Sequence, residues 1–191
     1  MRVLGISGST RGDSHNTSLL RAAAEILGRD SAVELEIWDG LKAVPPYDED
    51  DDVDLGPAAV TQLRAAVAGA DAILIATPEY NSSIPGQLKN ALDWVSRPIA
   101  TNPIRNTPVA VIGASTGIFG AVWAQAELRK VLGAMGARVV DGEVACGQAG
   151  TRFDEHGRLT DDALREQLAH VVSALVAEAA PQPEAHLPAA A

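Results

Sequence analysis

With 191 residues, the chain is long enough for one domain with a sizeable core and short for two. Its net charge of −10 and isoelectric point near 4.7 argue against binding nucleic acid or an anionic membrane through bulk charge, because both need a positive surface. The single cysteine, Cys146, excludes an intramolecular disulfide and a cysteine-rich metal site. No apolar run reaches transmembrane length, and no signal peptide precedes the MRVLGISGS start, so we expect a cytoplasmic protein.

Apolar runs and amphipathic segments alternate along the chain, which is the pattern of strands followed by helices. The patterns predict these elements in chain order: a strand at 2–7, a helix at 16–27, a strand at 33–38, a helix at 56–69, a strand at 72–77, a helix at 87–95, a strand at 108–114, a helix around 124–135, a strand at 137–145 and a helix at 161–180.

Five continuous apolar strands separated by amphipathic helices predict an α/β fold, in which a parallel sheet is covered by helices on both faces. Right-handed crossovers then favour a doubly wound sheet with the strand order 2-1-3-4-5. We expect residues 1–180 to form a single domain. The remaining segment 181–191, PQPEAHLPAAA, lacks periodicity and is predicted to be a disordered tail.

Ligands of open α/β sheets bind beyond the carboxyl ends of the strands, where the winding direction reverses. In the predicted order this point lies between the first and third strands. Three loops should meet there: SGSTRGDSHN at 7–16, TPEYNSSIPG at 77–86 and ASTGIFG at 114–120. A ligand-binding site is therefore expected among these loops.

The first loop has the composition of a phosphate site. It leads into a helix N-terminus, whose free N–H groups and dipole favour an anion. Neither the Walker A pattern nor the G-x-G-x-x-G dinucleotide fingerprint is present. Capping of the helix alone is the alternative reading, but one capping side chain would suffice for it. The loop offers six side-chain donors: Ser9, Thr10, Arg11, Ser14, Asn16 and Thr17.

The second loop combines polar groups with an aromatic ring. Pro78 holds the preceding residue extended and lets the chain leave the sheet. Tyr80 offers a flat apolar face with a polar tip for packing against a ring. Ser82 or Ser83 is expected to cap the following helix, with Pro85 in its first turn.

Two motifs resemble those of a known family. GSTRGDSHNTSLL, at 8–20, resembles the G-S-x-R-x-x-S-x-N-x-x-L signature of NAD(P)H-dependent FMN reductases, a group that includes quinone, azo-dye and chromate reductases. PEYNSSIPGQLKNALDW, at 78–94, resembles the second signature of that family nearly residue for residue. The likeness extends over roughly residues 2–145 and implies a flavodoxin-like fold.

The resemblance implies a site for FMN, with NADPH or NADH as co-substrate. The first loop would hold the phosphate, the second would line the ring and ribityl chain, and the third would contact the ring. Family members usually show a double glycine where this chain has Gly120-Ala121. The expected cofactor-binding residues are Ser9, Thr10, Arg11, Ser14, His15, Asn16, Thr17, Pro78, Glu79, Tyr80, Asn81, Ser115, Thr116 and Gly117.

Other reactive side chains carry weaker signals. The acidic run at 48–54 lacks the spacing and glycine of a calcium loop and reads as a solvated segment. The histidines are scattered, so no metal site is expected. Cys146 reads as a small core or loop residue. Trp123, after the third loop, is the tryptophan expected to approach the flavin or a partner subunit.

Two function classes fit the sequence. One is an oxidoreductase that takes a hydride from NAD(P)H onto FMN and reduces a small acceptor such as a quinone, azo compound, metal oxyanion or free flavin. The flavin carries this chemistry, so no protein acid or base is assigned as catalytic. The other is a flavodoxin-type one-electron carrier, although the T-x-T-G-x-T phosphate loop of typical flavodoxins is absent. A flavin-free binding module is a third reading. The resemblance also implies a homodimer or homotetramer.

Overall fold

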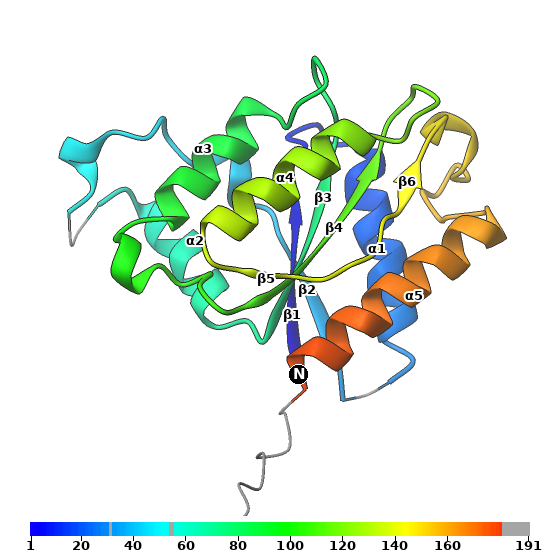
Figure 1. Ribbon diagram of the computed structural model, residues 1–191. Coiled ribbons are helices and arrows are strands. Elements are labelled where there is room, and N and C mark those ends of the chain that lie inside the picture. Colours follow the sequence, from blue (N-terminus) through cyan, green and yellow to red (C-terminus); the bar gives the residue numbers. More distant parts are fainter. Residues whose placement is uncertain (31, 54–55, 181–191) are drawn as a thin grey trace, which may run out of the picture.

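A computed structural model describes residues 1–30, 32–53 and 56–180 as a twisted parallel sheet between two layers of helices (Figure 1). The sheet order is β2-β1-β3-β4-β5, and the short strand β6 also pairs with β4. This confirms the predicted flavodoxin-like order. The strands are β1 (Arg2–Ser7), β2 (Glu34–Trp38), β3 (Ala72–Thr77), β4 (Pro108–Ala114), β5 (Arg138–Val139) and β6 (Ala145–Cys146).

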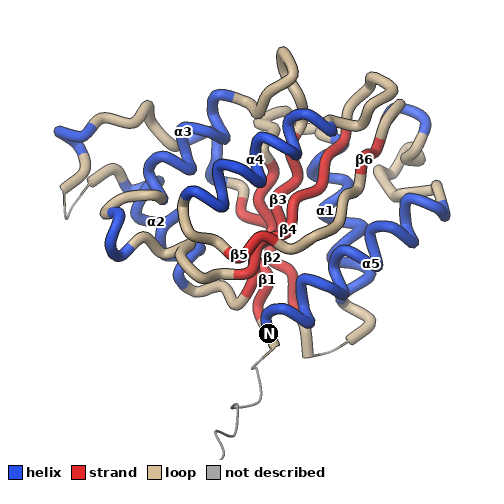
Figure 2. The backbone as a smooth tube through the Cα atoms, in the orientation of Figure 1, coloured by secondary structure: helices blue, strands red, loops and turns tan. Residues whose placement is uncertain are grey.

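The helices divide between the two faces of the sheet, as the tube view shows (Figure 2). α1 and α5 pack on one face, and α2, α3 and α4 pack on the other. The predicted tail at 181–191 lies outside the described residues. The α-helices are α1 (His15–Leu27), α2 (Ala58–Ala68), α3 (Gly86–Val95), α4 (Val122–Ala134) and α5 (Asp162–Ala179), with 3₁₀ turns at Gly40–Ala43, Glu49–Asp51, Ile99–Thr101 and Ala149–Thr151.

The central strands are apolar on both faces because helices cover both. Along β3, Leu74 packs toward α1 and α5, whereas its neighbours Ile73 and Ile75 pack toward the other three helices. Successive strand residues point to opposite faces, so one uninterrupted apolar run serves two hydrophobic clusters. This is why these strands could be predicted from their composition.

The prediction of one continuous strand at 137–145 is wrong. β5 and β6 are separate two-residue strands, and both pair with β4. While β4 advances from 109 to 113, its partner advances from 139 to 145, so the outer segment carries two additional residues. Gly142 bends this bulge at a φ of +129°. Arg129 supplies hydrogen bonds to Val111 O on β4 and to Gly142 O in the bulge.

Candidate functional site

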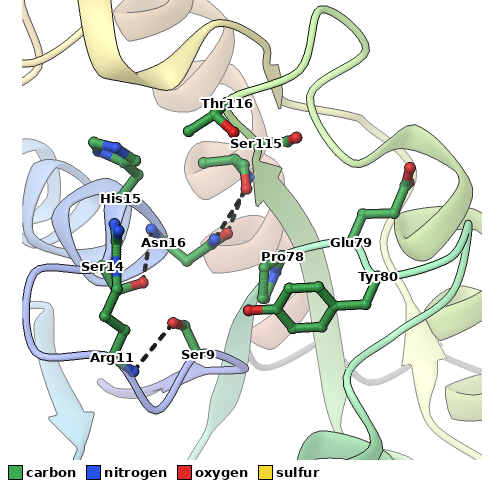
Figure 3. A pocket seen from close by; sticks show the side chains of 11 residues that line it. Ser9, Arg11, Ser14, His15, Asn16, Pro78, Glu79, Tyr80, Ser115 and Thr116 are labelled. Atoms are coloured by element: carbon green, nitrogen blue, oxygen red, sulfur yellow. Dashed lines mark hydrogen bonds between the residues drawn. The ribbon is translucent and has the colours of Figure 1, made fainter.

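A cleft of about 180 Å³ opens where the three predicted loops meet (Figure 3). It lies beyond the carboxyl ends of β1, β3 and β4, at the reversal point of the winding. The lining residues are Ser9, Arg11, Ser14, His15, Asn16, Pro78, Glu79, Tyr80, Ala114, Ser115 and Thr116.

The N-terminus of α1 forms one side of the cleft. Ser14 is its N-cap, and its Oγ accepts hydrogen bonds from the N–H groups of Asn16 (3.2 Å) and Thr17 (3.5 Å). The first turn of α1 contains no acidic residue, so nothing in it opposes an anion. Ser14 therefore caps the helix, as the alternative interpretation of the first loop expected. Because its oxygen acts as the acceptor in the cap, its hydroxyl hydrogen is available to donate to a ligand.

Asn16 and Thr17 use their side chains mainly within the fold. Asn16 is 3% exposed, and its amide exchanges two hydrogen bonds with the backbone of Ala114 at the end of β4, at 3.0 and 2.9 Å. Thr17 Oγ1 donates to Ser7 Oγ at 3.0 Å. Asn16 thus joins α1 to the third loop across 98 residues of sequence.

Arg11, which is positively charged, and His15, which is titratable, line the same side of the cleft. Arg11 is exposed, and its guanidinium donates to the backbone oxygen of Asp13 at 2.5 Å. His15 stacks on Phe153 with ring centroids 5.6 Å apart. Burial, and then the charge of Arg11, lower the pKa of His15 below its ordinary value, which favours the neutral ring near pH 7.

The second loop closes on itself in a tight turn. The N–H of Tyr80 donates to Ser83 O at 3.0 Å, and the N–H of Ser83 donates to Tyr80 O at 3.1 Å. Asn81 and Ser82, between them, have φ of 54° and 59°, as a type I′ turn requires. Figure 3 shows the Tyr80 ring turned toward the cleft, and 60% of this residue is exposed.

The prediction that Ser82 or Ser83 caps the helix after the second loop is wrong. α3 begins at Gly86 with Pro85 as the N-cap, and no side chain caps it. The backbone of Ser83 is engaged in the turn with Tyr80, so the chain reaches the helix two residues further on, at Pro85. Leu88, Ala91, Leu92 and Val95 are buried on the inward face of this helix.

Glu79 crosses from the second loop to α4. Its Oε2 accepts hydrogen bonds from the N–H groups of Trp123 (3.1 Å) and Ala124 (3.0 Å) in the first turn of α4. In Figure 3 its carboxylate points away from the cleft. Since Ala121, at the N-cap position, supplies no capping side chain, Glu79 replaces it from a distance.

The third loop is held against the segment after β6. Ser115 N donates to Cys146 O, and Gln148 N donates to Gly117 O, at 3.0 and 2.8 Å. Gly120 has a φ of +59°, and a Cβ there would lie 2.3 Å from the carbonyl carbon of Ala145. The next residue, Ala121, also has a positive φ, 63°, so alanine occupies a backbone conformation that glycine adopts more readily.

The cleft brings together most of the predicted site residues. Thr10, Thr17, Asn81 and Gly117 lie outside its lining. Ala114 lines it and was missed, although its place at the end of a central strand was a usable signal. The cap made by Glu79 was also missed, because no local pattern links it to α4.

The donor set fits a phosphate-bearing flavin. The hydroxyls of Ser9 and Ser14, the Arg11 guanidinium and the N-terminus of α1 lie together, which suits a phosphate. Pro78 and Tyr80 supply flat apolar surface beside them. Within the described ranges, no three His, Cys, Asp or Glu side chains are grouped to hold a metal ion. No helix there combines the length and the apolar character that crossing a membrane requires.

Known proteins share this sequence and fold. Residues 1–151 match the family described as NADPH-dependent FMN reductase. An NAD(P)H-dependent FMN reductase of Pseudomonas aeruginosa is 40% identical over 176 residues, covering 92% of this chain and 93% of the relative. A 2-hydroxy-1,4-benzoquinone reductase of Burkholderia sp. is 35% identical, covering 88% and 90%.

A solved structure agrees with these relatives. The flavoenzyme NAD(P)H:(acceptor) oxidoreductase FerB of Paracoccus denitrificans aligns with a TM-score of 0.82 and 33% identity, covering 93% of this chain and 96% of FerB. The sequence left open an enzyme, a one-electron carrier and a flavin-free binding module. The relatives and the solved structure are all described as reductases or oxidoreductases, which agrees with the enzyme. The chain therefore belongs to the NADPH-dependent FMN reductase family and is an FMN-dependent oxidoreductase that uses NAD(P)H.

Proposed function

We propose that the cleft binds FMN and that the loaded protein reduces a small acceptor, with a quinone as the first candidate. The convergence of three loops at the reversal point of the sheet, beside the N-terminus of α1, carries this proposal. The quinone-reducing relative from Burkholderia supports the acceptor class. Azo compounds, metal oxyanions and free flavin are the other acceptors to compare.

Each loop has a distinct role in this proposal. Ser9, Arg11 and the hydroxyl of Ser14 hold the phosphate, and the first turn of α1 adds N–H donors. The remaining candidates of the first loop are Thr10, His15, Asn16 and Thr17, of which His15 and Asn16 line the cleft. Asn16 and Thr17 act chiefly by fixing the loop through their hydrogen bonds to Ala114 and Ser7.

The second and third loops receive the flavin ring. Pro78 and Tyr80 offer packing surface, and Ser115 and Thr116 form the opposite wall, with Gly117 next to them in the same loop. Glu79 supports the site through the cap of α4, and Asn81 shapes the second loop through the turn after β3. Bound FMN supplies the redox chemistry, while the protein binds and orients it and excludes water. We assign no residue as a general acid or base.

We further propose a homodimer, or a dimer of such dimers, that acts in the cytoplasm. The cleft is open, and its volume of about 180 Å³ is below the usual range of ligand pockets, so we expect part of the FMN to extend over the rim. Large exposed apolar side chains flank that rim in the third loop and α4, including Phe119 and Trp123. A buried free thiol at Cys146 agrees with a reducing compartment.

Reconstitution with FMN tests the proposed function. The apoprotein is titrated with FMN, then NADPH and NADH are added anaerobically while the flavin absorbance is followed. We expect stoichiometric FMN binding, bleaching by a reduced nicotinamide, and reoxidation when a quinone is added. Failure to bind FMN, or a bound flavin that neither nicotinamide bleaches, would contradict the proposal. The second result would favour a one-electron carrier.

A further inference from the structure

Gln125 is a polar side chain enclosed beneath the third loop. It lies in the first turn of α4 and is 0% exposed. Its Nε2 donates to Gly120 O at 3.1 Å and to Val144 O at 3.2 Å. One amide thus ties the end of the third loop to the segment that leads into β6.

The same amide has a buried oxygen without a partner. Gln125 Oε1 makes no hydrogen bond to any described residue. Leaving such a carbonyl buried and unpaired costs stability, whereas an apolar side chain of the same shape avoids that cost. A methionine or leucine would remove this unpaired oxygen but would also leave Gly120 O without the donor that Gln125 supplies. The amide is best explained by the two carbonyl groups that it holds.

One of those two carbonyl groups belongs to Gly120, in the loop whose Ser115 and Thr116 line the cleft. Gly120 ends the loop, and its backbone already lies so close to Ala145 that no Cβ fits between them. Gly147 approaches Ile118 equally closely, since a Cβ there would lie 2.2 Å from Ile118 O. Residues Thr116 to Phe119 are exposed, and the contacts of the loop with the segment 144–148 are made by its backbone. The hydrogen bond from Gln125 to Gly120 O is one of the few contacts that fix the end of this loop.

We propose that Gln125 is a positioning residue for the flavin, holding the Ser115–Gly120 wall in the conformation that accepts the ring. The inference rests on the proposed FMN site, which the wall borders. When only a fraction of molecules has the competent conformation, the apparent dissociation constant rises by the inverse of that fraction. Gln125 does not line the cleft, so in this proposal it acts through the loop backbone.

Gln125→Met is the direct test. Methionine has a similar length, removes both donors and also removes the unpaired oxygen. Loss of a hydrogen bond of ordinary strength should raise the FMN dissociation constant about tenfold. The melting temperature of the apoprotein should fall by a few degrees at most, because removal of the unpaired Gln125 oxygen offsets part of the cost of leaving Gly120 O without a donor. Amide hydrogen exchange of residues 115–120 in the apoprotein should accelerate.

Asn102 provides a matched control. It is 5% exposed, and its Nδ2 donates to Ile99 O and Met135 O, both at 3.2 Å. Its Oδ1 also has no partner among the described residues, and it does not line the cleft. Asn102→Leu should leave FMN affinity and the exchange of residues 115–120 unchanged, whatever it does to stability.

A second variant guards against misfolding. Gln125→Asn keeps the amide but is one methylene too short to reach both carbonyl groups, and it should act in the same direction. Wild-type affinity and wild-type loop exchange in folded Gln125 variants would overturn the inference, as would equal loss of affinity in Asn102→Leu. A wild-type protein that binds no FMN would instead overturn the proposed function and this inference with it.

Discussion

Several residues that line the cleft also hold the fold through their side chains. Ser14 caps α1, Asn16 bonds to Ala114, and Glu79 caps α4. Each is a loop or helix-end residue whose polar group satisfies a backbone group near a strand or helix terminus. Substituting any of them would change both binding and stability. The residue that tests phosphate binding most directly is therefore Arg11, whose side chain bonds only within its own loop.

Arg11→Ala should weaken FMN binding roughly tenfold, about 1.4 kcal/mol, through loss of a charge-assisted hydrogen bond to the phosphate. Riboflavin, which lacks the phosphate, should bind both proteins equally. Titration of each apoprotein with the two flavins measures this. Arg21→Ala is the control, because Arg21 is exposed on α1 and the variant carries the same charge change. Equal losses of FMN and riboflavin affinity would refute the phosphate role.

Cys146 should resist alkylation while the protein is folded. Burial raises the pKa of its thiol from the ordinary 9.0 to about 11, a two-unit difference that lowers the thiolate fraction about a hundredfold near pH 8. The unfolded thiol ionises first as the pH rises, so this group destabilises the fold above pH 9. Iodoacetamide labelling before and after unfolding checks the prediction, and fast native labelling would contradict it.

At the scale of elements, the stretch after β3 divides into two parts. The turn from Tyr80 to Ser83 is closed by two backbone hydrogen bonds and carries an exposed ring. The helix that follows is anchored by its buried face, where Leu88 is 1% exposed. Because backbone hydrogen bonds close the turn, its side chains are available to contact a ligand. The side chains on the buried face of the helix are needed for packing.

Tyr80→Ala and Leu88→Ala should have opposite effects. Removing the exposed ring opens no core cavity, so the stability of the apoprotein should change by about 1 kcal/mol or less. NAD(P)H-driven quinone reduction should fall roughly tenfold, about 1.4 kcal/mol. Leu88→Ala should cost about 2–5 kcal/mol of stability through a cavity. Denaturant unfolding of the apoproteins, with steady-state rates, measures both. A Tyr80 variant that is as unstable as Leu88→Ala but turns over normally would make the turn a packing element.

The whole molecule combines a strongly acidic net charge with a local apolar rim. The net charge is −10, yet large apolar side chains are exposed beside the cleft. Ile118, Phe119 and Trp123 are 68%, 55% and 47% exposed, and the last two meet edge to face at 4.9 Å. A cluster of this kind is typical of an interaction surface, which supports the homodimer proposed above.

We expect the wild-type protein to sediment as a dimer or larger, above the 19.8 kDa of one chain. Trp123→Glu should shift it toward the monomer, because a charge at an apolar interface is left unpaired. The Glu79 cap uses the backbone N–H of residue 123 and is kept. Ile99→Glu is the control, since Ile99 is 61% exposed but outside the cleft lining. A wild-type monomer at micromolar concentration would refute the prediction.

The architecture, and the place where three loops form a cleft, could be predicted from the amino-acid sequence. Strands buried on both faces must be apolar throughout, so β1, β3 and β4 stood out by composition and their ends matched the prediction. Helical spacing identified the buried faces of the helices for the same reason. The order of a parallel sheet then brought three loops together, because the carboxyl ends of its strands share one edge.

The contacts of individual polar side chains could not be predicted in this way. Arg129, on α4, supplies hydrogen bonds to Val140 O and Gly142 O in the bulge between β5 and β6. Asn16 meets Ala114 across 98 residues, and Glu79 meets α4 across 45. A hydrogen bond needs its two atoms within about 3 Å, and no local pattern encodes which distant carbonyl or N–H group will lie there. The periodicity of a sequence indicates which side chains are buried, whereas the hydrogen-bond partners of its polar groups depend on the fold.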